Sequence, residues 1–400
     1  VWYSIGEALH QRADQTNAGI FRTGRDQIFG RRAILVCGRS KEMIRVLGLA
    51  LYGQLAASTR YRLAQFVPGL AEHGIELQVQ SLLGDEYLRR RFHGGRTPLA
   101  AMIGEGWKRL GDLNDSGHDL ALLHCELYPL MPGWLERALL RSKPYIYDFD
   151  DAFYLKYRRG KLGFLRPLLG RKFDGVIRDA VAVTAGSRTL QHYASVLNPR
   201  STVFPTVVDT DRYVPSKRRS ARSLTVGWIG SPSTAPYLKE LVEPLAKLAK
   251  EGPVRFVVIG GKAPNIPGVD LIEVAWTEAS EVELINGFDV GVMPLPDDDW
   301  ARGKCAFKLI QYMACGIPVV ASPVGANNDV VQDGCGLLAA DGEQWLEAFR
   351  TIRDDRMLAS RMGAVGRERA VRLYSLRRNI PVLVEVIRTS VAEGRARCAA

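Results

Sequence analysis

The stretch that most constrains the fold runs from Lys304 to Gly336 and contains one complete helix–strand step with its loops. Apolar residues recur at helical spacing up to Gly316, a residue type that tolerates positive φ and ends the predicted helix. Residues 317–321 then form a short β-branched run, apolar on both faces, which is typical of a buried parallel strand. A glycine-rich turn after such a strand, beside a helix N-terminus, is where α/β proteins hold anionic ligands.

Two lysines in this stretch, Lys304 and Lys308, lie one helical turn apart and are expected to point the same way. Spacing alone leaves two interpretations open. The pair either binds an anion in the cleft of an α/β protein, or it is solvated on the outside of an ordinary helix–strand unit.

The composition predicts a globular protein of two or three domains, since the 400 residues are 46% hydrophobic and 24% charged. No apolar run reaches the roughly 18–20 residues that a membrane helix needs, and no signal-peptide pattern is found. The six cysteines form no CxxC pair, so neither a zinc site nor a disulfide framework is indicated. We therefore expect a cytoplasmic protein, with peripheral contact at the inner face of the membrane as an option.

The net charge of +11 favours an anionic partner: nucleic acid, an anionic membrane face, or a phosphorylated small molecule. Basic residues cluster at 89–91 and 156–161, although each cluster alone is equally typical of a solvated surface. No RRM, helix-turn-helix or zinc-finger signature is present, so no nucleic-acid partner is expected.

Strands and helices alternate in two consecutive series, which predicts an α/β protein with two doubly wound, Rossmann-like domains facing a central cleft. The predicted strands are 33–37, 44–52, 75–79, 119–124, 144–147, 180–184, 203–206, 224–229, 254–259, 290–293 and 317–321. The predicted organisation is an extension outside the core at 1–42, a first domain at 43–207, a linker at 208–222, a second domain at 223–375, and a C-terminal helix at 376–400 that packs back on the first domain.

Six motifs carry a resemblance to a known family. The second half contains VGWIGSPST (226–234), DVGVMPL (289–295) and KLIQYMACGIPVVA (308–321), and the first half contains ASTRYR (57–62), YDFDDA (147–152) and TVVD (206–209). Together they resemble the GT-B glycosyltransferases of the large retaining family called glycosyltransferase family 4, or group 1. The resemblance covers nearly everything from Met43 onward, and its motifs do not specify donor sugar or acceptor.

The resemblance implies sugar transfer from a nucleoside-diphosphate sugar to a glycan or lipid-linked acceptor, with retention at the anomeric carbon and with no metal or cofactor. Basic side chains and helix N-termini stabilise the leaving diphosphate in this fold. The implied donor-binding residues are Gly230, Ser231, Ser233, Thr234, Lys304, Lys308, Gln311 and Gly325. The turn at 230–234 would also fit an ordinary capped αβ turn.

The sequence departs from the family pattern at four positions. Trp228 and Thr234 stand where the family commonly has an arginine and a lysine. The E-x7-E pair of the family falls at Gly303 and Gln311, so both carboxylates are missing. The diphosphate charge would then rest on Lys304, Lys308 and Arg302.

Three polar residues of the first half follow the first strand at the cleft edge: Ser58, Arg60 and Arg62. They would suit a phosphate group of the donor or of a lipid-phosphate acceptor. The alternative is that they are ordinary surface residues of a helix. Asp150 and Asp151 follow a later strand and could orient or deprotonate an acceptor hydroxyl, or cap a helix.

His124 could lie near the bound sugar, or it could have a structural role in the protein core. The triplet from Asp148 to Asp150 also spells DxD, the metal signature of the unrelated GT-A enzymes, but the two-domain pattern argues against that class.

Two other functions stay open beside the transferase. A sugar-nucleotide epimerase would use the same cleft and would turn over donor without acceptor. A non-catalytic partner subunit of a glycosyltransferase complex would fit the missing carboxylates and would not bind donor.

Overall fold

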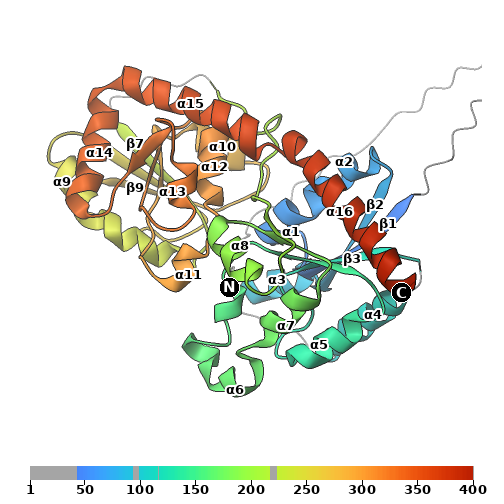
Figure 1. The fold of residues 1–400 in the computed structure, drawn as a ribbon. Coiled ribbons are helices and arrows are strands. Elements are labelled where there is room, and N and C mark those ends of the chain that lie inside the picture. The colour runs from blue at the N-terminus through green and yellow to red at the C-terminus, as the bar shows by residue number, and fades with distance from the viewer. Residues whose placement is uncertain (1–42, 93–98, 116, 217–222, 400) are drawn as a thin grey trace, which may run out of the picture.

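The computed structural model describes residues 43–92, 99–115, 117–216 and 223–399. The expected extension at 1–42, with the strand predicted at 33–37, lies outside the described residues. Two α/β halves lie side by side, and the last helix runs from one to the other (Figure 1).

The first half is built on a parallel six-stranded sheet with the order β2-β1-β3-β4-β5-β6. Its central strands are apolar runs with almost no exposed residue, because helices cover both faces of the sheet. The strands are β1 (Ile44–Tyr52), β2 (Ile75–Leu83), β3 (Leu120–His124), β4 (Tyr145–Phe149), β5 (Ala182–Ala185) and β6 (Ser201–Val203).

The helical segments of the first half connect these strands, and the longest lie before β3. Ser187 caps α8, since its side chain accepts a hydrogen bond from Leu190 N. The segments are α1 (Ala57–Arg62), η1 (Ala64–Phe66), α2 (Val67–Ala71), α3 (Asp85–Phe92), α4 (Leu99–Asn114), α5 (Gly133–Leu140), η2 (Phe153–Leu155), η3 (Gly160–Leu165), α6 (Arg166–Leu169), α7 (Lys172–Asp179) and α8 (Arg188–Ser195).

The second half repeats the plan with a parallel sheet of order β12-β11-β10-β7-β8-β9. Its strands are β7 (Leu224–Ile229), β8 (Val254–Ile259), β9 (Asp270–Val274), β10 (Val290–Met293), β11 (Val319–Ala321) and β12 (Gly336–Leu338). Its helices are η4 (Ala235–Leu241), α9 (Val242–Ala249), α10 (Glu281–Asn286), α11 (Asp299–Arg302), α12 (Phe307–Ala314), α13 (Asn327–Val330), α14 (Gly342–Asp354) and α15 (Arg356–Tyr374).

The chain crosses between the halves twice, and the two crossings are hydrogen-bonded to each other. Val208 N donates to Tyr374 O at 3.0 Å, and Leu376 N donates to Val208 O at 2.8 Å. The segment predicted as a linker therefore begins inside the protein, where Val208 and Tyr213 are fully buried. The two crossing segments are thus paired through their backbones.

The last helix, α16 (Leu376–Ala399), follows the second crossing and lies against the first half (Figure 1). It contacts α2, β3 and β4. Its apolar side chains belong to the same buried cluster as residues of β1 and β3, and the four that are fully buried are Leu383, Val384, Ile387 and Val391.

Several secondary-structure predictions were wrong. The apolar spacing at 61–73 predicts a single helix, but the structure divides it into α1, η1 and α2, where Pro68 lies in the first turn of α2 and has no N–H to continue the preceding helix. The spacing at 237–251 also predicts one helix, which begins instead as the 3₁₀ segment η4. Strands β9 and β12 were not predicted, because β9 is an edge strand with mixed polar residues and β12 is an edge strand of three residues, so neither has the apolar run of a central strand.

Candidate active site

A pocket lies between the halves, at the carboxyl ends of strands from both sheets. Residues after β1 line it from the first half, and the turns after β7 and β9 with α10 and α12 line it from the second. Its lining residues are Leu55, Ala56, Ala57, Arg60, Tyr61, Leu88, Ile229, Gly230, Ser231, Trp276, Glu281, Phe307 and Gln311.

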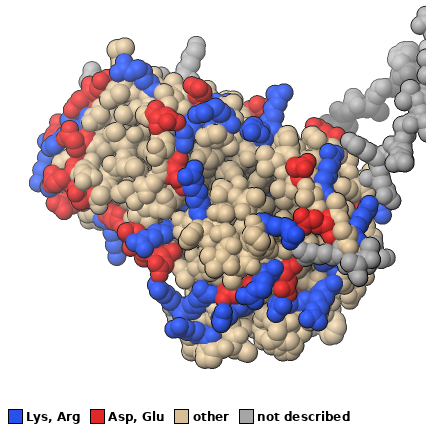
Figure 2. All heavy atoms as spheres, viewed as in Figure 1, with Lys and Arg blue, Asp and Glu red and all other residues tan. Residues whose placement is uncertain are grey.

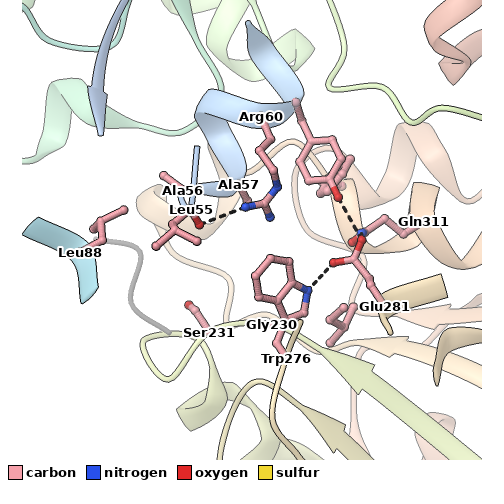
Figure 3. A pocket seen from close by; sticks show the side chains of 13 residues that line it. Leu55, Ala56, Ala57, Arg60, Leu88, Gly230, Ser231, Trp276, Glu281 and Gln311 are labelled. Carbon is pink, nitrogen blue, oxygen red and sulfur yellow. Dashed lines mark hydrogen bonds between the residues drawn. The ribbon is translucent and has the colours of Figure 1, made fainter. Parts of the chain in front are cut away.

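Arg60 reaches across this pocket from α1 toward Trp276 of the second half (Figure 3). Its guanidinium carbon is 4.6 Å from the centre of the indole ring, a cation–π contact. Arg60 Nη1 donates to the carbonyls of Gln54 at 2.8 Å and Leu55 at 3.0 Å, so the side chain is held in place. The buried Arg60 Nε has no hydrogen-bond partner among the described residues.

Glu281 is the buried carboxylate that organises the other wall. Its Oε1 accepts hydrogen bonds from Tyr61 Oη at 2.9 Å and from Gln311 Nε2 at 3.0 Å, and also from Tyr213 Oη. Its Oε2 accepts from Trp276 Nε1, which fixes the indole ring (Figure 3). Burial raises the pKa of Glu281, although these donors oppose the rise.

No sequence pattern identified Glu281 or Trp276 as site residues. Neither lies in a motif, and Trp276 follows the unpredicted strand β9. The carboxylate of Glu281 joins both halves through Tyr61, which lies 220 residues earlier in the chain. Gln311, a predicted donor-binding residue, is therefore already engaged by Glu281.

Lys308 is not among the residues that line the pocket, but it lies next to Gly230 in the turn after β7 and has little solvent contact. It is 8% exposed, and its Nζ is 5.5 Å from the centre of the Trp228 ring. Burial, and then the charge of Lys304, lower the pKa of Lys308 to about 7. An anion bound beside this amine would stabilise its protonated, positively charged form.

Lys304 does not belong to the helix on which it was predicted. Helix α12 begins at Phe307, because Ala306 has a left-handed backbone with φ of 55°. Lys304 Nζ instead lies 3.5 Å from Asp151 Oδ2 of the other half. Burial would lower the pKa of Lys304, but Asp151 with the neighbouring titratable groups raises it.

The turn from Gly230 to Thr234 joins the pocket at the end of β7. Its hydroxyls bond to each other, with Ser231 Oγ 2.7 Å from Ser233 Oγ and Thr234 Oγ1 donating to Ser231 O at 3.1 Å. A Cβ on Gly230 would lie 2.9 Å from Lys308 Cε, so the glycine lets the lysine pass close to the turn. The turn and Lys308 are thereby brought together.

The first motif position of the missing carboxylate pair has no room for a side chain. A Cβ on Gly303 would lie 2.5 Å from the Cβ of Ala152, in the loop after β4. Gly325 has φ of 54°, and a Cβ there would lie 2.4 Å from Arg302 O. The guanidinium of Arg302 pairs with Asp297 at the surface, with Nε 2.6 Å from Oδ1, and does not join Lys304.

Arg62 does not reach the pocket surface. Its Nε donates to Asp148 Oδ2 at 3.0 Å and its Nη1 to Phe204 O at 2.7 Å, and the side chain is fully buried. Burial alone would raise the pKa of Asp148, but Arg62 and His124 hold it well below its usual range. Ser58 is half-buried in α1.

His124 and Asp150 lie together beneath the loop after β4. His124 Nδ1 is 2.7 Å from Asp148 Oδ2, and its Nε2 is 3.7 Å from Asp150 Oδ1. Asp150 Oδ1 has no hydrogen-bond partner among the described residues, and burial raises the pKa of Asp150. Asp151 Oδ1 accepts from Ala152 N at 3.0 Å, so this residue stabilises its own loop as well as Lys304.

One group of three described residues could hold a metal ion: His124, Cys125 and Asp150 place ligand atoms within 4.8 Å of one another. Cys125 Sγ is 3.1 Å from His124 Nε2, and burial raises the pKa of its thiol well above the usual value.

Asp148 of the DxD triplet is engaged by Arg62, His124 and Thr184. The triplet therefore does not present two free carboxylates to a metal–diphosphate.

Residues 223–355 match the family model of glycosyl transferases group 1. This match covers the second half, including the turn at 230–234, Glu281 and α12. A comparison with curated protein sequences finds no match.

Several solved structures share the fold over most of the chain. Sucrose-phosphate synthase from Thermosynechococcus elongatus has a TM-score of 0.64 at 16% identity, covering 88% of this chain and 100% of its own. HepE from Anabaena, in complex with UDP and glucose, has a TM-score of 0.62 at 14% identity, covering 86% and 100%. WaaG, a glycosyltransferase involved in lipopolysaccharide biosynthesis, has a TM-score of 0.58 at 15% identity, covering 86% and 99%. The chain therefore has the GT-B fold that the motifs predicted.

Proposed function

We propose that this protein is a retaining glycosyltransferase of the family 4 type, which transfers a sugar from a nucleoside-diphosphate sugar to a glycan or lipid-linked acceptor. The observation that carries the proposal is the lysine pair at the cleft. Lys308 lies beside the turn at 230–234, and Lys304 is close enough to lower the pKa of Lys308; both belong to the half that matches the group 1 family model. HepE, which shares the fold, was solved with UDP and with UDP-glucose.

The proposed donor site uses the pocket and its basic end. The nucleoside would lie against Trp276, and the diphosphate would lie at Gly230 and Ser231 with Lys308 and Lys304 neutralising it. In the reaction the bond from the anomeric carbon to the phosphate oxygen breaks, and a bond to the acceptor oxygen forms on the same face. The lysines stabilise the negative charge that develops on the leaving diphosphate.

Asp150 is the proposed acceptor of the hydroxyl proton. Its Oδ1 is unpartnered among the described residues, and its raised pKa suits a group that gains a proton during the reaction. His124 lies 3.7 Å away and is oriented by Asp148. Asp151 would position Lys304, since the two groups lie 3.5 Å apart.

We propose that the transfer needs no metal and no cofactor. The lysines supply the positive charge that a divalent cation supplies elsewhere. Transfer measured with and without EDTA tests this point, and activity lost in EDTA and restored by manganese would contradict it.

The primary experiment is a thermal-shift screen of the purified protein with UDP, GDP, ADP, dTDP and their common sugars. A ligand that binds only the folded state stabilises it by about 2.7 kcal/mol at a hundredfold excess over its dissociation constant. The expected result is a shift with one nucleotide family that the Lys304→Ala/Lys308→Ala variant loses. Turnover of that donor is then followed with candidate acceptors, and NMR of the product gives the anomeric configuration.

A non-catalytic partner subunit is the second candidate, because Gly303 has no space for the carboxylate of the family and Gln311 is held by Glu281. No shift with any nucleotide would favour this function. Donor turnover without an acceptor would instead identify a sugar-nucleotide epimerase. The protein is proposed to act in the cytoplasm, at the inner face of the membrane when the acceptor is lipid-linked.

A further inference from the structure

Residues 156–172 form a basic and apolar segment that the proposed chemistry does not use. The sequence KYRRGKLGFLRPLLGRK has seven lysines and arginines and no acidic residue. It contains η3 and α6, which project from the first half (Figure 1). Phe164 is 75% exposed and Leu168 is 59% exposed, although large apolar side chains normally lie inside.

Other exposed apolar residues lie beside this segment. Trp134 is 67% exposed and follows Gly133, where an added Cβ would lie 2.5 Å from Lys172 O at the end of the segment. Leu130 is 54% exposed, and its N–H donates to Tyr157 Oη at 3.0 Å. The segment therefore packs against the loop after β3 and the start of α5, which carry Leu130 and Trp134.

The basic side chains of the segment differ in their partners, and Arg158 and Arg159 form ion pairs with Asp174 and Asp299. Lys172 and Lys156 are held by Glu126, at 2.7 and 2.5 Å, and stabilise the interior. Arg166 is exposed, and the side chain of Arg171 is 86% exposed, with its Nε 3.3 Å from Asp174 Oδ2. Basic side chains predominate along this lower edge of the first half (Figure 2).

The combination favours an anionic lipid bilayer over a protein or a nucleic acid. Aromatic and leucine side chains that stand out among arginines match the interfacial zone of a bilayer, where rings enter the head-group region and cations meet anionic lipids. No helix within the described ranges is long and apolar enough to cross a bilayer. Docking by this surface needs no such helix.

We propose that Leu130, Trp134, Phe164, Leu168, Arg166 and Arg171 form a membrane-docking surface that binds anionic phospholipid. The inference deepens the proposed function and rests on it only in naming the acceptor as lipid-linked. The same segment borders the cleft, since Arg159 forms an ion pair with Asp299 of the second half. A lipid-linked acceptor held at this surface would thus meet the cleft at its rim.

The test is co-sedimentation of the full chain with extruded vesicles, of phosphatidylcholine alone or mixed with phosphatidylglycerol. The expected result is binding only to the mixed vesicles, and weaker binding at high salt. The Arg166→Ser/Arg171→Ser variant should bind about thirtyfold more weakly, as expected for two arginines near an anionic surface. The Trp134→Ser/Phe164→Ser variant should lose about tenfold or more through its lost apolar contact.

Matched controls come from α15 in the other half. Met357 is 73% exposed and Arg361 is exposed, so Met357→Ser and Arg361→Ser change similar side chains away from the proposed surface and should bind vesicles normally. Thermal unfolding confirms that each variant is folded.

Three outcomes would overturn the proposal: no vesicle binding by the wild-type chain, equal binding by all variants, or a salt-sensitive self-association that the surface variants lose in place of vesicle binding. Because no transfer is measured, UDP binding and vesicle binding succeed or fail separately. Vesicle binding without binding of any nucleotide in the screen would leave the docking surface supported and would argue against the transferase.

Discussion

Lys308 makes donor binding depend on pH in a range where free lysine does not titrate. Its pKa of about 7 means that half of the molecules carry the neutral amine at neutral pH. A diphosphate binds the charged form, so the apparent dissociation constant should increase with pH. For a group with this pKa, the weakening between pH 7 and about pH 8.5 is about sixteenfold, or about 1.6 kcal/mol.

The free energy of unfolding of the ligand-free protein should also depend on the titration of Lys308. It should increase with pH over a range where the affinity for the ligand decreases. The folded-state pKa of Lys308 is below its usual value of 10.5, so the unfolded chain binds more protons between about pH 7 and that value. The contribution of Lys308 to stability therefore rises with pH across this window. Protonation of the buried amine at lower pH lowers the stability of the free protein, and a bound anion would offset this loss.

The assay is isothermal titration with UDP, which is fully ionised above neutral pH. Wild-type affinity should fall as pH rises, and binding near pH 8 should be accompanied by uptake of about one proton. Lys308→Arg keeps a charge at all these pH values and should give a flat profile. A flat profile in the wild type, with no proton uptake, would refute the placement of the diphosphate beside Lys308.

Three further predictions concern the framework. Gly303→Ala should lower the free energy of unfolding by about 1–3 kcal/mol in urea titrations, because its methyl group would overlap Ala152; an unchanged midpoint would show that the halves are not packed at this point. Asp148→Asn should cost about 3–5 kcal/mol, since it leaves the buried Arg62 without its ion pair, and equal stability would contradict that account. Burial raises the pKa of Glu136 to about 7, so its contribution to stability falls as pH rises from its usual value of 4.5 toward 7, and Glu136→Gln should flatten this part of the melting-temperature profile. An equally steep profile in that variant would assign the slope to another group.

Much of the fold follows from local sequence patterns. The strands at 44–52, 224–229, 254–259 and 290–293 were predicted at their observed bounds, because buried parallel strands are short apolar runs between turns. The helix break at Gly316 was also confirmed, with φ of 68°. Such features depend on neighbouring residues alone.

The site could be predicted only in part, because its geometry depends on residues far apart in the sequence. Lys304 and Lys308 were chosen from helical spacing, yet Lys304 precedes the helix and is positioned by Asp151 of the other half. Arg62 lies in the motif with Arg60, but its burial is set by Asp148, 86 residues later. No spacing rule identifies Glu281, which bonds to groups from four separate segments.

Because α16 packs on the first half, the two halves need not complete folding in the order in which they are synthesised. On the ribosome the first half emerges first, but Leu383, Ile387 and Val391 of its core belong to the last part of the chain. Until they arrive, the apolar face that they cover stays open to solvent and to chaperones. The second half can fold completely before the first does. A stop codon ahead of α16 would therefore damage the domain made earliest, not the one made last.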